Sequence, residues 1–368
     1  MVLVAGTLVS SFTSVHLYRL PPEPAGRRGA ERAILSANLA LAGLAGLLVA
    51  AVAPLLGPGL GTGAAAVLVA GSVIGLCARS LAASRGAMAL SAAVSAFSFA
   101  VVFLMVALEL ALGHGPSVPL LLVLMGLAQA LAGGAVIRRL SGPGAADFGP
   151  AARRRWRVLA RRSGWSLLAG ASNEVFTRLG IFTVPLLFGA PALAGLAAAS
   201  TMLRPATLLA GAFGSGARGP LAARRHAGDA RGFWRLLVLG AAVPTTVTLA
   251  WSGVVAALWP LVSGWIYGGR YEGLETEVLL WGAVFGLGCC WVAGLAGLQT
   301  LGRLRSLALA ELGGAVACAA AMVPMLLLLG PRGALVATIL GGLVQVTLLA
   351  RAVSRGLRAG GEGPSFIR

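Results

Sequence analysis

The sequence has no lysine, few acidic residues and few cysteines, and each shortage excludes a class of protein. All 29 basic residues are arginine, only 11 are acidic, and charged residues make up 11% of the 368, against roughly 25% in a soluble domain. The four cysteines lie in or beside apolar segments without CxxC spacing, so we expect no disulfide framework and no metal site. No phosphate-binding Walker loop, Ser/His/Asp set or dinucleotide fingerprint occurs, so we expect no catalytic residues and no cofactor. The chain does not read as an enzyme.

Apolar residues are abundant instead: 58% of the chain is hydrophobic, and 53 residues are glycine. A bilayer core about 30 Å thick needs roughly 20 apolar residues for each spanning helix. The sequence therefore predicts an all-α polytopic membrane protein of about eleven helices. Ten apolar runs lie near 33–57, 63–78, 87–112, 118–137, 164–187, 191–216, 236–262, 277–300, 307–330 and 333–352, and a shorter one lies at 1–18.

The arginines are distributed unevenly between alternate connections. Short turns rich in glycine and proline make consecutive helices antiparallel, so alternate connections share a side of the membrane. One side then holds 25 of the 29 arginines, while the other holds only Arg270 and Arg332. By the positive-inside rule the rich side is cytoplasmic, which places the N-terminus outside, the C-terminus in the cytoplasm and the chain in the cytoplasmic membrane. This asymmetry accounts for the basic composition, so nucleic acid is not an expected partner.

A weak internal repeat divides the chain. AGRRGAERAILSANLALAG, after the first apolar run, resembles AARRHAGDARGFWRLLVLGAA, after the seventh, and SRGAMALSAAVSA resembles GRLRSLALAELGGA before the fourth and tenth. Aligning the first run with the seventh, through to the fifth with the eleventh, leaves only the sixth without a mate. We therefore predict an incomplete N-terminal lobe at 1–140, a basic cytoplasmic linker at 141–163, a C-terminal lobe of six helices at 164–358 and a tail at 359–368. The expected parent architecture has twelve helices, of which the first is missing here.

Four segments of the second half resemble a known superfamily in order and in predicted side of the membrane. They are GARGPLAARRHAGDARGFWRLL, WIYGGRYEG, LQTLGRLRSLALAE and LLLLGPRGALVATILGGLVQ. The chain is similar to the multidrug/oligosaccharidyl-lipid/polysaccharide exporter superfamily, specifically its polysaccharide-biosynthesis flippase branch, most clearly over 165–355.

The resemblance implies two six-helix lobes that open alternately to each face and turn a lipid-linked oligosaccharide across the membrane. It also implies membrane lipids as neighbours and polysaccharide polymerase or glycosyltransferases as partners. The departure is at the N-terminus, because the family's first helix lines the central cavity and has no counterpart here.

Three charged residues fall near the middle of apolar runs, where ionisable groups usually face a bundle interior or a wet cavity. Glu174 and Arg178 are one helical turn apart and can pair, and Arg204 lies at a similar depth on the next run. One interpretation assigns Arg178 and Arg204 to an anionic phosphate headgroup, with Glu174 moderating the charge or titrating with a coupled Na⁺ or H⁺. The other is a structural ion pair between packed helices, with Arg204 bonded to backbone freed by Pro205.

Uncharged polar residues in the runs have two interpretations as well. Asn173 and Gln345 are candidates for contacts with sugar hydroxyls, but such side chains also hold membrane helices together. Glu109 and Glu311 lie three or four residues inside predicted helix ends, which favours an interfacial position for both.

The favoured function is a flippase for a lipid-linked oligosaccharide or a related polysaccharide precursor. The alternatives are a cation-coupled multidrug exporter of the same fold, for which an acid-rich cavity is expected, and a non-transporting scaffold in polysaccharide synthesis.

Overall fold

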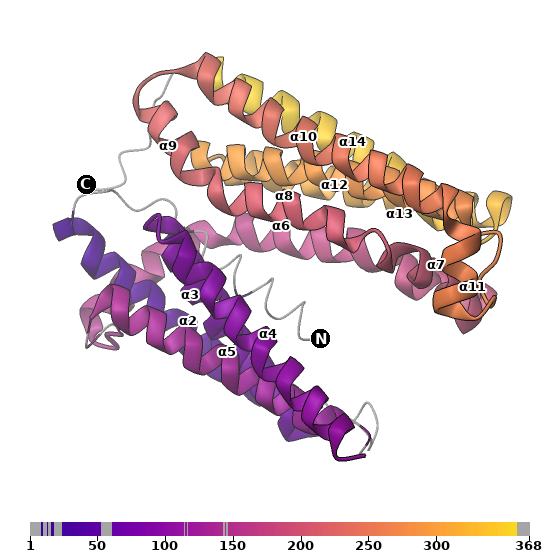
Figure 1. Ribbon diagram of the computed structural model, residues 1–368. Coiled ribbons are helices and arrows are strands. Elements are labelled where there is room, and N and C mark those ends of the chain that lie inside the picture. Colours follow the sequence, from indigo (N-terminus) through magenta and orange to yellow (C-terminus); the bar gives the residue numbers. More distant parts are fainter. Residues whose placement is uncertain are drawn as a thin grey trace. The chain divides into compact units, whose positions relative to one another are not determined.

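The computed structural model describes Val9, Thr13, His16 and Leu17, then residues 24–52, 61–113, 115, 117–142, 144 and 146–358. Within these ranges the chain forms thirteen α-helices and no strand (Figure 1). The helices belong to two compact units, Met1–Leu167 and Leu168–Arg368. The predicted tail at 359–368 and most of the predicted helix at 1–18 lie outside the described residues.

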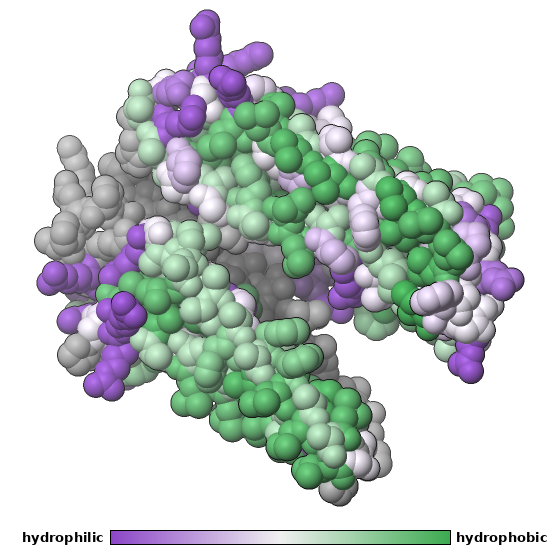
Figure 2. All heavy atoms as spheres, viewed as in Figure 1, coloured by the Kyte–Doolittle hydropathy of each residue, from purple (hydrophilic) through white to green (hydrophobic). Residues whose placement is uncertain are grey.

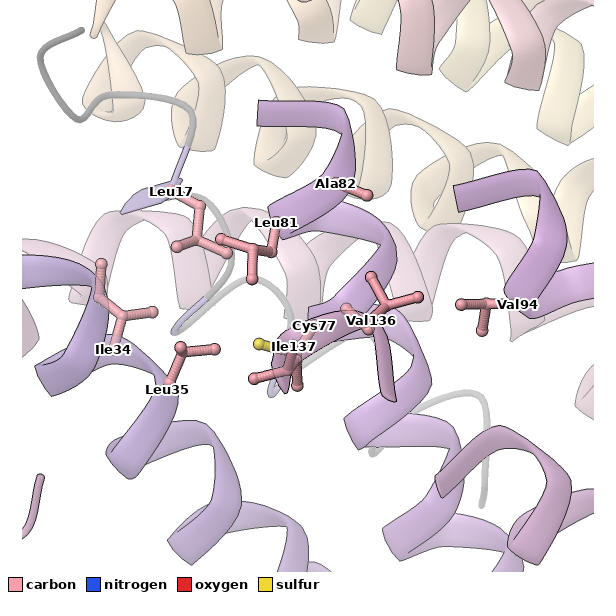
Figure 3. Close-up of a cluster of buried hydrophobic side chains, with 10 residues drawn as sticks. Leu17, Ile34, Leu35, Cys77, Leu81, Ala82, Val94, Val136 and Ile137 are labelled. Atoms are coloured by element: carbon pink, nitrogen blue, oxygen red, sulfur yellow. The ribbon is translucent and has the colours of Figure 1, made fainter. Parts of the chain in front are cut away.

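The first unit is built on four long helices: α2 (Pro24–Val52), α3 (Thr62–Ser84), α4 (Met88–Ala111) and α5 (Val118–Ser141). It also includes the beginning of α6 (Pro150–Phe188). Helix α2 packs on α3, α3 packs on α5, and α4 packs on both α3 and α5. One hydrophobic core joins the four long helices: Figure 3 shows Ile34 and Leu35 of α2, Cys77 and Leu81 of α3, Val94 of α4 and Ile137 of α5 around a common centre.

Small residues let α3 and α5 approach closely. A Cβ atom built at Gly126 of α5 would lie 2.6 Å from the carbonyl oxygen of Val67 and 2.8 Å from Cα of Leu68, both in the backbone of α3. Gly71 of α3 faces the backbone of Gly126 in return. Apolar attraction between side chains gives little net gain within a lipid bilayer, so close backbone packing of this kind stabilises a helix pair there.

An arginine joins three elements at one end of the first unit. Arg85, which follows α3, donates from Nε to Oε1 of Glu31 on α2 at 3.3 Å and from Nη2 to Oε2 at 2.5 Å. Its Nη1 group donates to the carbonyl of Leu140 near the end of α5. Only 2% of Glu31 is exposed, so this two-point pairing neutralises a buried carboxylate. The start of α2 therefore lies beside the ends of α3 and α5, so α2 runs antiparallel to both.

The second unit holds the rest of α6 and eight further helices. They are α7 (Ala190–Thr201), α8 (Arg204–Gly216), α9 (Arg218–His226), α10 (Ala230–Ala257), α11 (Trp259–Tyr267), α12 (Glu275–Leu301), α13 (Leu304–Leu329) and α14 (Arg332–Arg358). Helix α12 packs on α10 and α14, α13 packs on α14, and α8 packs on α10 and α12. In Figure 2 hydrophobic residues cover much of the length of α10 in this unit, and hydrophilic ones gather at its two ends.

The two units repeat one pattern of neighbours. In the first, α2 packs on α3, α3 on α5 and α4 on α5; in the second, α10 packs on α12, α12 on α14 and α13 on α14. The internal repeat in the sequence relates the same helices: it aligns α2 with α10, α3 with α12, α4 with α13 and α5 with α14. Among the described helices of the first unit, none takes the place of α6 in this correspondence.

The number of spanning helices differs from the sequence prediction. Eight described helices are long and apolar enough to cross a membrane, or nine if the bent pair of α7 and the segment Arg204–Arg225 counts as one. Helix α6 is not among the eight, and its apolar half carries Asn173, Glu174 and Arg178. The segment predicted as a linker is already helical from Pro150, because alanine, arginine and leucine between 151 and 162 favour a helix.

Candidate functional site

The two charges predicted to pair on α6 do so. Arg178 Nε donates to Oε2 of Glu174 at 2.7 Å, across one turn of the helix. The side chains are 27% and 13% exposed, so both are largely withdrawn from the surface of the chain. The two terminal nitrogens of the guanidinium carry four of its five N–H donors and are not used in this bond.

The pair faces away from the helices on which α6 packs. Phe176 of α6 packs closely on Gly341 of α14, and Gly180 lies against Ala334 of the same helix. Val184 belongs to the hydrophobic core that α13 and α14 share. Glu174 and Arg178 are each two residues from Phe176, which at about 100° per residue directs them to the opposite side of α6. Both charges belong to one helix, so the ion pair forms within α6, and the two interpretations of its role stay open.

The second predicted cation lies at a break between two helices. The apolar run 191–216, predicted as one helix, is divided into α7 and α8, which meet at an angle of 61°. Pro205 accounts for the break: its ring would clash with the carbonyl four residues earlier, and α7 ends at that residue, Thr201. The prolines inside α6, α10 and α13 leave those helices continuous.

The break frees a backbone carbonyl, which a tryptophan of another helix takes. Trp251 Nε1 of α10 donates to the carbonyl oxygen of Met202 at 2.9 Å. One of the two interpretations of the sequence expects Arg204 to bond backbone freed by Pro205. Instead, the Arg204 side chain is exposed, and it forms no ion pair or hydrogen bond with any other described residue; only its backbone carbonyl accepts, from Thr207 Oγ1 at 2.7 Å.

Arg178 and Arg204 lie at similar distances from the turn that connects α6 and α7. This turn is at Gly189, whose φ of 81° suits glycine. Arg178 precedes it by eleven residues, or about 17 Å of helix, and Arg204 begins α8 beyond the twelve residues of α7, which span about 18 Å. The second unit thus carries two guanidinium groups and one carboxylate on α6 and α8, on either side of this turn.

A buried polar cluster in the same unit was missed. Glu311 is 1% exposed; it accepts from Trp291 Nε1 at 2.5 Å and from the amide nitrogen of Gln345. The sequence placed Glu311 near a helix end, whereas α13 begins at Leu304 and buries it between α12 and α14. Gln345 is 2% exposed and has a protein partner, which fits the packing role left open for it better than a sugar contact.

The internal repeat contained a signal for Gln345 but not for Glu311. Residues 126–129 read GLAQ in α5 and residues 342–345 read GLVQ in α14, and these helices correspond in the repeat. Gln129 is buried like Gln345, so an amide at this point belongs to the helix packing of both units. The acid is not repeated, so no pattern in the sequence pointed to Glu311.

The remaining polar candidates occupy separate places. Asn173 is half-buried next to the Glu174–Arg178 pair. Glu109 accepts from the backbone nitrogen of Ser117 at 3.0 Å, at the turn between α4 and α5. No cluster of three or more histidine, cysteine, aspartate or glutamate side chains at metal-binding distance occurs in the described ranges.

No protein-family model and no curated protein sequence matches this chain. Several solved structures do. An outward-facing multidrug resistance MATE family transporter of the MOP superfamily is 13% identical, with a TM-score of 0.75 over 97% of this chain and 85% of the other. A MOP superfamily transporter from Pyrococcus furiosus, described as having a binding pocket of reverse polarity, has a TM-score of 0.69 at 12% identity, over 96% and 85%. The Vibrio cholerae MATE transporter VcmN in its bent form has 0.67 at 11%, over 98% and 86%.

These likenesses confirm an all-helical fold of the MATE type. At 11–13% identity the similarity shows the fold alone.

Proposed function

We propose that the protein is a membrane transporter that works by alternating access and carries an anionic lipid-linked oligosaccharide or a related envelope-polymer precursor across the cytoplasmic membrane. The observation that carries this proposal is the free guanidinium of Arg204, since Trp251 already satisfies the carbonyl that the break exposes. A permanently charged group inside an apolar segment is costly, and such groups usually face a ligand or a wet cavity. An anionic cargo would supply the negative charge that pairs with Arg204.

Arg178 suits the same cargo because Glu174 engages only one of its donors. The bond from Nε fixes the plane of the guanidinium, and the terminal nitrogens remain free for two parallel bonds to a phosphate. The neighbouring carboxylate lowers the net positive charge of the site. A cargo with a phosphate or pyrophosphate is then held, yet leaves again when the transporter reverses its orientation.

We place Arg178 and Arg204 in one binding site because both lie in apolar segments on either side of the turn at Gly189, each more than three helical turns from it. Arg204 provides the unpaired charge and Arg178 the oriented one. Asn173, beside Glu174, is a candidate for a sugar hydroxyl.

A second candidate function is a cation-coupled exporter of small molecules. Two of the similar structures are described as multidrug resistance or MATE transporters, and Glu174 offers a carboxylate for a cationic drug or for a coupled Na⁺ or H⁺. In that case Glu174 would bind the cargo or the ion, and Arg178 would restrain the carboxylate.

Flipping of a fluorescent polyprenyl-pyrophosphate oligosaccharide by purified protein in vesicles separates the two. Arg178→Gln and Arg204→Gln should each lower its affinity about tenfold or more, because a hydrogen bond to a charged group contributes about 1.5–3 kcal/mol. Arg270→Gln, an exposed arginine of the loop between α11 and α12, serves as the control for loss of one charge.

Unchanged flipping in both variants would remove the proposal. Transport of a cationic dye that Glu174→Gln abolishes, with no transport of the lipid, would assign the chain to the second function.

A further inference from the structure

A surface groove lies along the first turns of α10, outside the candidate site. Its volume is about 570 Å³, and it is lined by Ala230, Arg231, Trp234, Arg235, Val238 and Leu239. All six belong to one stretch of one helix and share a face. The opposite face of this stretch, with Phe233, Leu237 and Gly240, is buried against the rest of the unit.

Two unpaired cations lie in the first half of the groove. Arg231 and Arg235 are one helical turn apart and exposed, and neither forms an ion pair or hydrogen bond with another described residue. The acid nearest to them in sequence, Asp229, is already engaged: Arg224 pairs with it at 3.3 Å, and the Gly232 nitrogen donates to it at 2.8 Å. Two neighbouring guanidiniums without a carboxylate favour a phosphate.

Side chains change character in order along the groove. Arg231 comes first, Trp234 (38% exposed) and Arg235 follow about one turn later, and Val238 and Leu239, which are 46% and 50% exposed, come last. In the view of Figure 2 the hydrophilic end of this unit near the start of α10 gives way to hydrophobic surface farther along the helix. Cationic and aromatic side chains followed by aliphatic ones match the change from the headgroup and interface region to the acyl region across one leaflet of a bilayer.

We propose that this groove binds one anionic phospholipid of the surrounding membrane, of which phosphatidylglycerol is the simplest example. Its phosphate lies between Arg231 and Arg235, and one acyl chain follows Val238 and Leu239 along α10. A zwitterionic lipid fits less well, because none of the six lining residues is acidic and its ammonium group would have no partner. The site is independent of the transported cargo.

Native mass spectrometry of the full-length protein, released from detergent with added phosphatidylglycerol or phosphatidylcholine, counts the lipids that stay bound. We expect one phosphatidylglycerol to be retained in preference to phosphatidylcholine. Arg231→Gln with Arg235→Gln should weaken its binding about 30-fold, which corresponds to about 2 kcal/mol, or about 1 kcal/mol for each arginine at a membrane surface.

A matched control exists at the same end of the unit. Arg351 and Arg355 of α14 are also exposed and one turn apart. They lie at the level of the groove on α10, because Gly297 of α12 is adjacent to both Leu237 of α10 and Val353 of α14. Arg351→Gln with Arg355→Gln changes the charge equally but leaves the groove intact. Size-exclusion chromatography of each variant checks that the fold is retained.

Retention of phosphatidylglycerol by the control and its loss from the groove variant would support the site. An equal loss from both would reduce the effect to general attraction between charges and overturn the proposal, as would equal retention of the two lipids by the unaltered protein. A groove that took a polyprenyl pyrophosphate and no phosphatidylglycerol would overturn it too, and would assign the groove to the cargo.

Discussion

The close contact of α3 and α5 gives a quantitative test of the fold. Replacing Gly126 with alanine puts a methyl group 2.6 Å from the Val67 carbonyl oxygen, whereas an ordinary contact needs at least 3.4 Å. The opposing atoms are backbone, so α3 and α5 would have to separate by about 0.8 Å. A gap of this size forfeits a quarter to a half of each dispersion contact nearby.

We expect Gly126→Ala to cost about 2 kcal/mol, within the range of 1–3 kcal/mol for overpacked cores. In a unit of this size that lowers the melting temperature by about 4–8 °C. Thermal unfolding of the purified protein in detergent micelles, followed by size-exclusion chromatography after each heating step, measures the shift.

Gly134→Ala is the matched control, since it makes the same change in the same helix. A methyl group there meets no atom within 4 Å, and alanine favours a helix over glycine by up to about 1 kcal/mol. Its melting temperature should stay the same or rise. Equal melting temperatures for the two variants would refute the close packing of α3 on α5.

Three further predictions concern polar contacts. Arg85→Gln should destabilise the first unit by about 3 kcal/mol by removing the two-point ion pair of the buried Glu31 carboxylate, and Glu31→Gln in the same chain should restore part of that loss; a thermal-stability cycle of the two variants measures their coupling. Glu311→Ala should destabilise the second unit more than Glu311→Gln, because it leaves the donors of Trp291 and Gln345 without an acceptor; comparable melting temperatures would contradict this. Asp229→Ala removes the N-cap of α10 and should cost about 1 kcal/mol, seen as faster amide hydrogen exchange in the first turn of that helix.

Apolar run length was sufficient to predict most of the long helices, because a bilayer imposes one length on every spanning segment. It could not predict the break at Pro205 as distinct from the unbroken prolines at 185, 244 and 324, since all four lie inside apolar runs. The hydrogen bond that Met202 accepts at this break comes from Trp251, some 46 residues beyond Pro205, and no local pattern predicts it.

The candidate site was predictable in part for a related reason. Glu174 and Arg178 pair within one helix, so their spacing alone was enough to predict the contact. The partners of Glu311 come from α12 and α14, and the sequence contains no local sign of such distant contacts. Its burial therefore became visible only in the folded chain.

The hydrogen bond from Trp251 to Met202 makes the bend between α7 and α8 observable by light. An indole whose N–H is bonded emits at longer wavelength than one that has lost its partner in an apolar setting. The chain has eight tryptophans. In a variant that keeps only Trp251, the fluorescence emission maximum would shift to shorter wavelength whenever this bend straightens and the hydrogen bond breaks. One fluorophore, native to the protein, would then follow the bend during turnover.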